Sequence, residues 1–277
     1  MPFTTRPDAD PCPDVPHVRR IMPFIMRTRN ESVVYFEQHI DVDEAERFLA
    51  ESRAKDGVRA TLLTLVVFAF ARVLHERPRL NRFVAGHRIW QRRGVWISFS
   101  AKKAKTDDAP IVVVKRRIEP GASFADVARA LDGGISEGRS DRASTTDKEL
   151  SLAFRLPTFV VGLVVRALFV LDRFGLLPRA LIDADPLFAS LFIANLGSIG
   201  LDAGYHHLYE YGNIPIFAVV GRTEDVLVAD GAGGVRTARR ATIRYTFDER
   251  IEDGLYCVRA LERVKQTLED PRAHVST

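Results

Sequence analysis

The chain has 277 residues, 46% of them hydrophobic and 27% charged, and its formal net charge at pH 7 is +4. A chain of this length can bury a substantial core, either as one large domain or as two small ones. Its basic residues form short, scattered clusters without a finger, zipper or aromatic–basic repeat, which argues against nucleic-acid binding and fits weak attraction to anionic ligands.

The amino-terminal stretch, residues 1–17, has no apolar core of the kind found in signal peptides. We expect a disordered tail there, followed by a single domain over residues 18–277. The two cysteines, Cys12 and Cys257, imply neither a disulfide framework nor a thiolate metal site. We therefore expect a cytoplasmic protein without a metal centre.

Strand and helix patterns then alternate along the chain without a clear linker. Period-two alternation and valine-rich runs predict strands at residues 33–40, 111–118, 187–194, 214–220, 226–229 and 241–247. Apolar residues at three- and four-residue spacing predict helices after Asp41, over residues 62–74 and 124–131, and after Gly254. These elements predict one α/β domain with a mixed sheet.

Local signals set the predicted ends of these elements. Asp41, with Glu44 three residues on, has the spacing of a capping box. Residues 83–90 and 95–101 are spaced to pair as a hairpin around Arg93-Gly94. The polar stretch 133–148 is predicted to be a loop.

Two apolar runs resemble membrane spans, but one is too short and the other contains charged residues. Residues 62–74 are too few to cross a bilayer and predict a core helix. Residues 159–177 carry Arg166, Asp172 and Arg173, which makes a true span costly. We expect a buried or interface helix there and do not favour the alternative, contact with a membrane surface.

The stretch ATIRYTFDERIEDG, residues 241–254, combines a predicted strand, a cluster of charged residues and the start of a predicted helix. Ile243, Tyr245 and Phe247 alternate with polar residues up to Asp248. Such a corner can aim carboxylates and a guanidinium at a ligand. The alternative is that these charges are solvated or paired with one another.

Several motifs in order resemble the catalytic domain of 2-oxoacid dehydrogenase dihydrolipoyl acyltransferases, whose fold is shared with chloramphenicol acetyltransferase. The matching residues are Asp41-Val42, Pro78-Arg79-Leu80-Asn81, Asn195-Leu196-Gly197, Gly221, Asp230-Gly231, Asp248-x-Arg250 and Asp253-Gly254. The likeness spans Val18 to Leu268 and is best in the last third.

This resemblance implies a mixed sheet flanked by helices and a homotrimer with active sites in channels between subunits. Coenzyme A would enter each channel from one side, and an acyl carrier or acceptor from the other. The lipoyl domain, the peripheral-subunit-binding domain and the linkers of full-length members have no counterpart in this sequence. The resemblance therefore implies a stand-alone core without its own lipoyl arm.

The sequence departs from the family at two catalytic positions. Glu249 stands where the family has the histidine that takes a proton from a thiol, and Ala194 stands where a serine or threonine usually donates to the oxyanion. A glutamate is a weaker base than a histidine by roughly a hundredfold, and losing an oxyanion donor costs roughly another hundred- to thousandfold. The family's carboxylate at Asp253 is kept, and the resemblance implies that it pairs with Arg19 to hold the loop.

Other residues are candidates to replace the lost groups. His206 and His207 could supply a base, and Ser198 a hydroxyl donor. The alternative is that both histidines are surface or interface residues bonded to backbone or tyrosine. A metal site that uses them with Glu249 is not expected, because adjacent histidines on a strand point apart.

Two functions follow from these residues. The first is a divergent coenzyme A-dependent acyltransferase, with Glu249 or the histidines as base. The second is a catalytically degenerate trimeric scaffold, a pseudoenzyme with a binding, regulatory or assembly role. In either case Asn195, Gly197, Asp248, Arg250 and Gly254 are expected to shape the channel or its walls.

Overall fold

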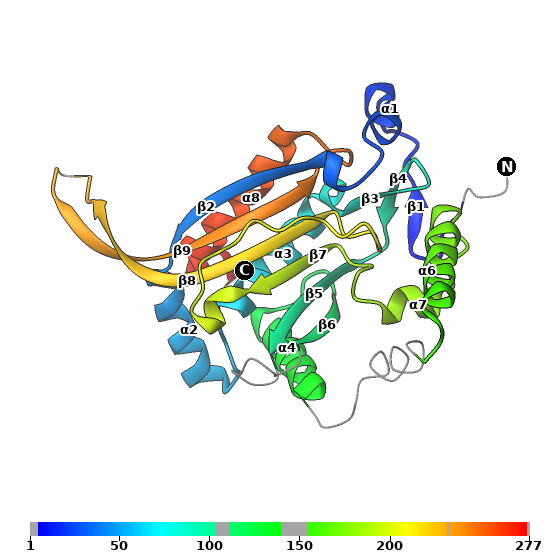
Figure 1. The fold of residues 1–277 in the computed structure, drawn as a ribbon. Helices are drawn as coiled ribbons and strands as arrows, with labels where there is room; N and C mark the ends of the chain where they lie inside the picture. The colour runs from blue at the N-terminus through cyan, green and yellow to red at the C-terminus, as the bar shows by residue number, and fades with distance from the viewer. Residues whose placement is uncertain (1–4, 103–110, 140–154, 232, 276–277) are drawn as a thin grey trace.

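The computed structural model describes residues 5–102, 111–139, 155–231 and 233–275 (Figure 1). Its strands are β1 (Ala9–Pro11), β2 (Val33–Asp41), β3 (Arg82–Ala85), β4 (Arg88–Arg92), β5 (Val95–Lys102), β6 (Ile111–Ile118), β7 (Leu191–Asn195), β8 (Ile216–Ala229) and β9 (Val235–Asp248). Its helices are α1 (His17–Ile25), α2 (Asp43–Asp56), α3 (Leu62–Glu76), α4 (Phe124–Arg139), α6 (Thr158–Arg173), α7 (Arg179–Ala184), α8 (Gly254–Glu269) and α9 (Pro271–Val275). Short 3₁₀ helices are η1 (Asn30–Ser32), η2 (Pro78–Asn81) and η3 (Leu196–Ile199).

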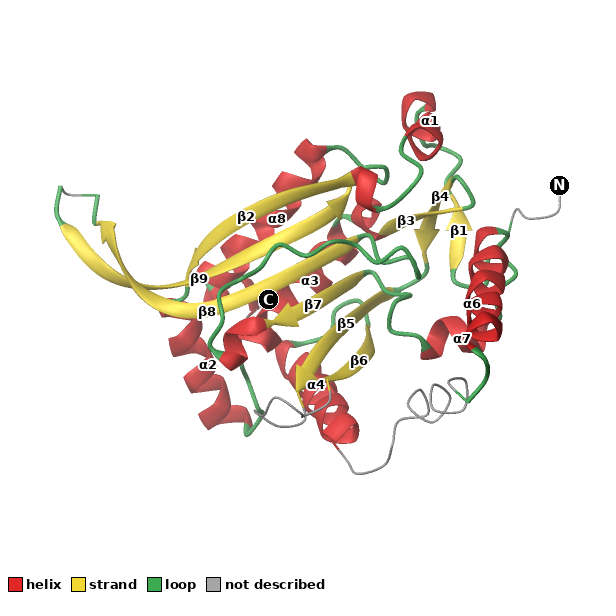
Figure 2. Cartoon of the chain, viewed as in Figure 1, coloured by secondary structure: helices red, strands yellow, loops and turns green. Residues whose placement is uncertain are grey.

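A six-stranded mixed sheet forms the centre of the molecule, in the order β2-β9-β8-β7-β5-β6 (Figure 2). β5, β7 and β8 run parallel to one another, whereas the β2–β9, β8–β9 and β5–β6 pairs are antiparallel. The predicted α/β class with a mixed sheet flanked by helices is confirmed. The β8–β9 hairpin extends well beyond the rest of the sheet (Figure 1).

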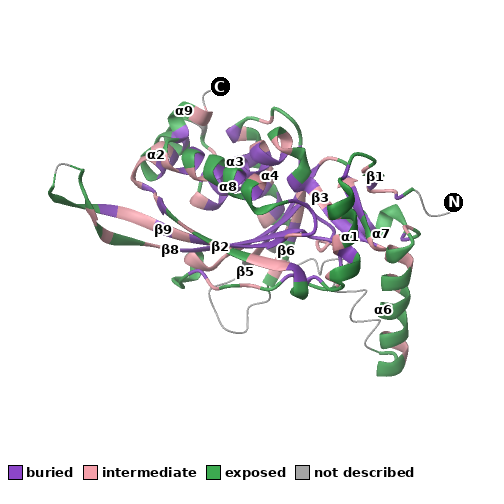
Figure 3. Ribbon diagram, turned by 90° about the horizontal axis from the view of Figure 1, so that it is seen from above, coloured by how far each residue is buried: buried purple, intermediate pink, exposed green. Residues whose placement is uncertain are grey.

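A layer of helices covers one face of this sheet, with α2, α3, α4 and α8 together on one side (Figure 3). α3 is the central helix of the layer and has eleven buried residues, because its apolar positions run around most of its circumference. Its first turn is fixed by a capping box in which Thr61 and Thr64 exchange side-chain and backbone hydrogen bonds. The main core lies between this layer and the sheet.

The opposite face of the sheet is covered by an extended segment, residues 200–215, that leads from η3 to the beginning of β8 (Figure 1). Leu208 and Ile214 of this segment join a second apolar cluster with Phe192 and Phe217 of the sheet. This face therefore has its own smaller core, and none of the described helices forms a layer over it.

Residues 5–17 do not form the disordered tail that we expected. β1 pairs with β4 in a small antiparallel sheet of order β1-β4-β3. Arg6 is almost fully buried, and its guanidinium binds the carboxylates of Asp8 at 2.9 Å and Asp172 at 2.7 Å. Sequence periodicity missed this anchor because a three-residue strand is too short to show a period.

The predicted hairpin of residues 83–90 with 95–101 is also wrong. β3 pairs instead with β4 around Gly86-His87, both with positive φ, as a tight two-residue hairpin requires. β5 leaves this small sheet and lies between β7 and β6 in the large one. Burial of Ile97 and Phe99 in the main core favours that placement.

The ends of several elements differ from the prediction. α2 begins after Val42 without a side-chain cap, because the Asp41 carboxylate is bound by Arg240 at 3.0 Å. α4 continues to Arg139, through part of the predicted 133–148 loop, and residues 140–148 lie outside the described ones. The two strands predicted at 214–220 and 226–229 are one strand, β8, with an irregularity between Val220 and Thr223.

The apolar helix α6 is exposed on the single chain and has no buried residue. Of the two predicted roles, the buried helix is therefore wrong for the single chain, and the interface helix stays a prediction. It lies beside the small sheet, at the end of the molecule away from the helix layer (Figure 3). In the described part of the chain, no helix combines the length and the apolar character that crossing a membrane would need.

Candidate functional site

A cleft of about 750 Å³ lies at the carboxyl ends of the parallel strands β5 and β7. Its walls come from α2, α3, α4 and η3, including Arg53, Arg59, Thr64, Asn195 and Ser198. Crevices at this end of parallel strands are where α/β folds commonly bind ligands. The volume falls within the range of small-molecule sites.

One wall of the cleft favours anions. The amino terminus of α3, at Thr61–Thr64, opens into it and carries the positive end of the helix dipole. Arg53 donates to the carbonyl of Ala60 at 2.8 Å, just before this helix. Arg59 lies 3.9 Å from Asp132, at the long end of the salt-bridge range and with its side chain 59% exposed, so it remains available to a ligand.

The Asn195–Gly197 turn forms another wall of the same cleft. The Asn195 side chain accepts from the backbone N–H of Ser198 at 3.2 Å, and the Ser198 hydroxyl donates back to the Asn195 carbonyl at 2.8 Å. A Cβ at Gly197 would lie 2.4 Å from the carbonyl oxygen of Gly221. Glycine is therefore required at position 197 for η3 to pack against β8.

The charged turn after β9 is mostly structural. Asp248 is fully buried and binds Arg250 through two hydrogen bonds, at 2.8 and 2.7 Å, while Arg250 also reaches the Met26 carbonyl. Glu252 accepts from Arg79 at 3.2 Å, which ties the turn to η2. Within the turn, Asp248 and Arg250 pair with each other, as the structural interpretation predicts, whereas Glu252 pairs with an arginine outside the turn.

The predicted ion pair between Asp253 and Arg19 is not formed. The exposed Asp253 carboxylate caps α8 by accepting from the Tyr256 N–H at 2.8 Å. Arg19 donates to the Glu249 carbonyl at 2.7 Å instead. The Tyr256 N–H is the main cause of the lowered pKa of Asp253, and the charge of Arg19 adds to it.

Glu249 itself is held by its backbone, whose N–H donates to the Ser32 carbonyl at 2.9 Å. The backbone of Glu249 is therefore fixed at its N–H by Ser32 and at its carbonyl by Arg19. Among the described residues, no hydrogen bond or ion pair holds its half-buried carboxylate. The carboxylate is free to meet a ligand or another chain.

Within one chain, Glu249 and the Asn195 turn lie at opposite ends of the sheet. Asn195 pairs with Val220, which in turn pairs with Ile243, six residues before Glu249. At ~3.3 Å per strand residue, this spacing alone is ~20 Å. The structure therefore brings Asn195, Gly197 and Ser198 together but does not bring Glu249 to them.

The two histidines lie on the face of the sheet that has no helix layer. The His206 ring stacks on Phe217 at 4.0 Å and on His207 at 4.8 Å. His206 Nδ1 is 2.6 Å from the His207 carbonyl, and His207 Nδ1 is 3.0 Å from the Leu208 carbonyl. Burial lowers the pKa of His206, so near neutral pH its ring is uncharged and engaged with local backbone.

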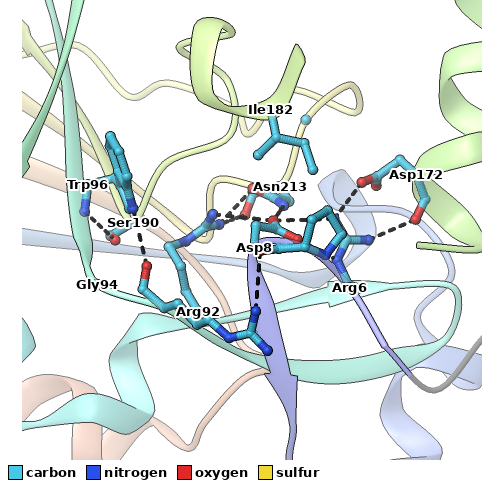
Figure 4. A network of polar contacts seen from close by, with 12 residues as sticks. Arg6, Asp8, Arg92, Gly94, Trp96, Asp172, Ile182, Ser190 and Asn213 are labelled. Carbon is cyan, nitrogen blue, oxygen red and sulfur yellow. Dashed lines mark hydrogen bonds and ion pairs between the residues drawn. The ribbon is translucent and has the colours of Figure 1, made fainter. Parts of the chain in front are cut away.

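Two groups of polar residues were missed by the sequence interpretation. The first is the basic wall of the cleft, Arg53 and Arg59, which lies in an ordinary-looking polar stretch between two predicted helices. The second is a buried network in which Arg6, Asp8, Arg92, Asp172 and Asn213 meet (Figure 4). Both depend on contacts between residues far apart in sequence, for which a single sequence carries no signal.

Comparison with known structures places the chain in a structural class. Its fold is similar to that of chloramphenicol acetyltransferase, with a TM-score of 0.53 at 11% identity over 91% of this chain and 94% of that one. The dihydrolipoamide acetyltransferase of Azotobacter vinelandii, whose catalytic mechanism was studied through a serine, a histidine and an asparagine, has a TM-score of 0.61 at 22% identity. That match covers 95% of this chain and 94% of the other.

A more particular likeness comes from the sequence of the last third of the chain. Residues 187–275 match the family model of the 2-oxoacid dehydrogenases acyltransferase catalytic domain. The catalytic core of the 2-oxoacid dehydrogenase complex from Thermoplasma acidophilum has the same fold, with a TM-score of 0.58 at 15% identity over 95% of this chain and all of that one. A sequence search of curated proteins finds no match. The resemblance predicted from the motifs is confirmed.

Proposed function

We propose that this protein is a divergent coenzyme A-dependent acyltransferase that works as a homotrimer. The observation that carries the proposal is the cleft of about 750 Å³ at the carboxyl ends of β5 and β7. We call it the basic cleft after the wall that carries Arg53 and Arg59, although Glu46 and Asp132 also line it. Coenzyme A combines phosphate groups with a long, narrow arm that ends in a thiol. Arg53, Arg59 and the amino terminus of α3 offer charge and N–H groups suited to the phosphates.

The separation of the two halves of the predicted site supports a site that is shared between copies of the chain. Glu249 and the Asn195 turn are each fixed by backbone hydrogen bonds, so neither can cross the sheet to reach the other. A second copy that places its Glu249 at the cleft of the first would complete the site. Cyclic homo-oligomers commonly build sites at their interfaces in this way.

In the completed site, Glu249 is the proposed base that takes the proton from the thiol or from the attacking group of an acceptor. Asn195 and Ser198 would position the thioester end, and Ala194 supplies only a methyl group where an oxyanion donor would lie. A glutamate base and a missing donor together slow the thiol reaction by roughly 10⁴-fold if the effects are independent. An amine or hydroxyl acceptor on an acyl carrier or small molecule is therefore as reasonable as a thiol.

The first experiment measures coenzyme A binding by isothermal calorimetry. The wild-type chain should bind, and Arg59→Ala should bind roughly tenfold more weakly because a charge-assisted contact to phosphate is lost. Arg47→Ala is the matched control, since Arg47 is an exposed arginine of α2 that pairs with Glu44 outside the cleft. No binding at millimolar coenzyme A would reject the proposal.

The second experiment measures turnover of acetyl-CoA with a panel of amine, hydroxyl and thiol acceptors. Glu249→Gln should lower kcat at least a hundredfold with little effect on coenzyme A affinity, because only proton transfer is removed. Unchanged turnover in that variant would show that Glu249 is not the base.

A second candidate function is a binding or assembly scaffold without catalysis, and one observation favours it. Among the described residues that line the cleft there is neither a histidine nor a cysteine, and its only acids are Glu46 and Asp132. Tight coenzyme A binding without acyl transfer to any acceptor would select this candidate over the enzyme.

A further inference from the structure

A second large cavity, of about 380 Å³, shares no lining residue with the basic cleft. It lies where the end of α1, the β3–β4 turn, one face of α6 and the segment before β8 meet. Five arginines line this cavity, against two acids, Asp172 and Glu210. We call it the arginine pocket.

Both acids of the arginine pocket are already bound. Asp172 accepts from Arg6 at 2.7 Å, in the buried network of Figure 4. Glu210 accepts from the backbone N–H groups of Arg29 and Asn30 and from the Asn30 side-chain amide. Neither carboxylate is therefore left to neutralise a cation that faces the cavity.

Most of the arginines, in contrast, have no acidic partner. Arg250 is bound by Asp248. For Arg27, Arg166 and Arg173, no carboxylate of the described chain lies within salt-bridge distance. The pocket thus gathers exposed arginines that have no carboxylate within salt-bridge distance among the described residues, which favours an anion there.

Arg29 adds a buried charge to the same wall. Its guanidinium donates to the carbonyls of Gly212 at 2.7 Å, Ile214 at 3.2 Å and Val84 at 3.3 Å, and to no carboxylate. Burial lowers the pKa of Arg29, and the negative charges of Asp248, Asp172 and Glu210 offset that effect only in part. A bound anion would offset it further.

The other lining of the pocket is apolar. On α6, Arg166, Phe169, Val170 and Arg173 follow the i, i+3, i+4, i+7 spacing of a single helix face, which alternates charge with apolar surface. The Phe169 ring lies edge-on to Tyr211 at 5.5 Å. A ligand that touched both arginines of this face would also lie against Phe169 and Val170.

The frame of the pocket is fixed by specific contacts. A Cβ at Gly86 would lie 2.1 Å from the Arg173 carbonyl, so glycine there allows the β3–β4 turn to touch the end of α6. His87 Nδ1 is 2.9 Å from the Pro23 carbonyl, and the His87 ring stacks on Phe24, which ties the same turn to α1. Preformed walls of this kind reduce the entropic cost of binding.

We propose that the arginine pocket binds an organic anion, a carboxylate or phosphate monoester carried on an apolar body. The charged group would meet Arg166, Arg173 and Arg27, and the apolar body would pack on Phe169 and Val170. This site is independent of the basic cleft and of the proposed acyltransferase activity.

Calorimetry with three probes tests both halves of this proposal in the full chain. Octanoate carries a carboxylate and an apolar body, octanamide lacks the charge, and inorganic phosphate lacks the apolar part. We expect octanoate to bind at least tenfold more tightly than either of the others. Raising the salt from 50 to 500 mM should weaken its binding, since the contact is electrostatic at a partly exposed site.

Variants locate the binding. The double substitution Arg166→Gln with Arg173→Gln should weaken octanoate binding at least tenfold. Arg155→Gln, an exposed arginine before α6 that does not line the pocket, is the matched control and should leave the affinity within twofold. Phe169→Ala should weaken octanoate binding and leave phosphate binding unchanged.

Three results would overturn the proposal. One is the absence of octanoate binding at millimolar concentration in the wild-type chain, and another is equal affinity for octanamide. The third is an equal loss in Arg155→Gln and in the double variant, which would indicate unspecific attraction to a basic surface. Coenzyme A binding measured on the same variants should be unchanged, so failure here is distinguishable from failure of the proposed function.

Discussion

The buried pair of Asp248 and Arg250 shows how the charged turn stabilises the fold. Each side chain is almost completely removed from water, and their two hydrogen bonds satisfy the charges. Removing one partner leaves the other uncompensated. We expect Arg250→Met to lower the free energy of unfolding by about 3–5 kcal/mol.

Urea denaturation measures this loss, with Arg259→Met as the control because Arg259 is exposed on α8 and should change stability by less than ~0.5 kcal/mol. Equal, small effects in both variants would show that the pair is not a determinant of stability.

Lys115 is a partly buried charge, and its contribution to the free energy of unfolding depends on pH. Burial lowers the pKa of its ammonium to about 8, although it donates to the carbonyls of Ile182 and Asp185. The unfolded chain holds this proton up to an ordinary pKa near 10.5, so between pH 8 and 10.5 the unfolded state binds more protons. The penalty for burying the charge is full below pH 8 and is relieved as the pH rises through that window.

We therefore expect the free energy of unfolding to carry a contribution that rises by up to about 3 kcal/mol between pH 8 and 10.5 and is absent in Lys115→Met. Denaturation curves of both proteins at pH 7.5 and 10 measure it, and Lys55→Met, an exposed lysine of α2, should behave as wild type. A pH dependence identical in wild type and Lys115→Met would contradict the assignment.

Among the elements, η3 depends on a close backbone approach at Gly197. A Cβ there would meet the carbonyl of Gly221 at 2.4 Å, and neither group is the flexible end of a side chain. We expect Gly197→Ala to destabilise the fold by about 1–3 kcal/mol and to weaken coenzyme A binding, since η3 forms a wall of the cleft.

Gly204→Ala is the matched control for that change, because a Cβ at Gly204 meets no atom within 4 Å. Thermal unfolding and calorimetry of the two variants give the comparison. If Gly197→Ala is as stable as Gly204→Ala, η3 is more adaptable than its packing indicates.

Elements with a strong period were predictable from sequence. β2, β6, β9, α3 and α8 were identified because one face of each packs on the main core. The partner of a strand was not predictable: β4 and β5 are neighbours in the chain, yet they join different sheets. Alternation specifies which face of a strand is buried but not what lies beside it.

For the candidate site, the motifs pointed to Glu249 and the Asn195–Gly197 turn, because glycine and capping residues at fixed offsets mark a particular backbone path. The catalytic roles of these residues stay predictions. The Asp253–Arg19 pair was wrong, since a capping interaction three residues along the chain competes for the same carboxylate. Arg53 and Arg59 were missed because only the packing of α2 and α3 on the sheet turns them toward η3.

For the whole molecule, the proposed trimer makes a direct prediction. Light scattering after size-exclusion chromatography should give three times the 31.1 kDa of the single chain. A stable monomer that still turns over acetyl-CoA would contradict an active site built from two copies. An inactive monomer would contradict the trimer but agree with an active site that is incomplete in a single chain.

If the site is shared between copies as proposed, the distance between Glu249 and the Asn195 turn has a further consequence, for genetic complementation. A chain damaged at Glu249 and a chain damaged at Arg53 and Arg59 would each be inactive alone. If the two variants were unfolded, mixed in equal amounts and refolded into mixed trimers, about a quarter of the active sites would be intact. Those sites combine the cleft of one variant with the Glu249 of the other. Two broken genes could thus complement one another.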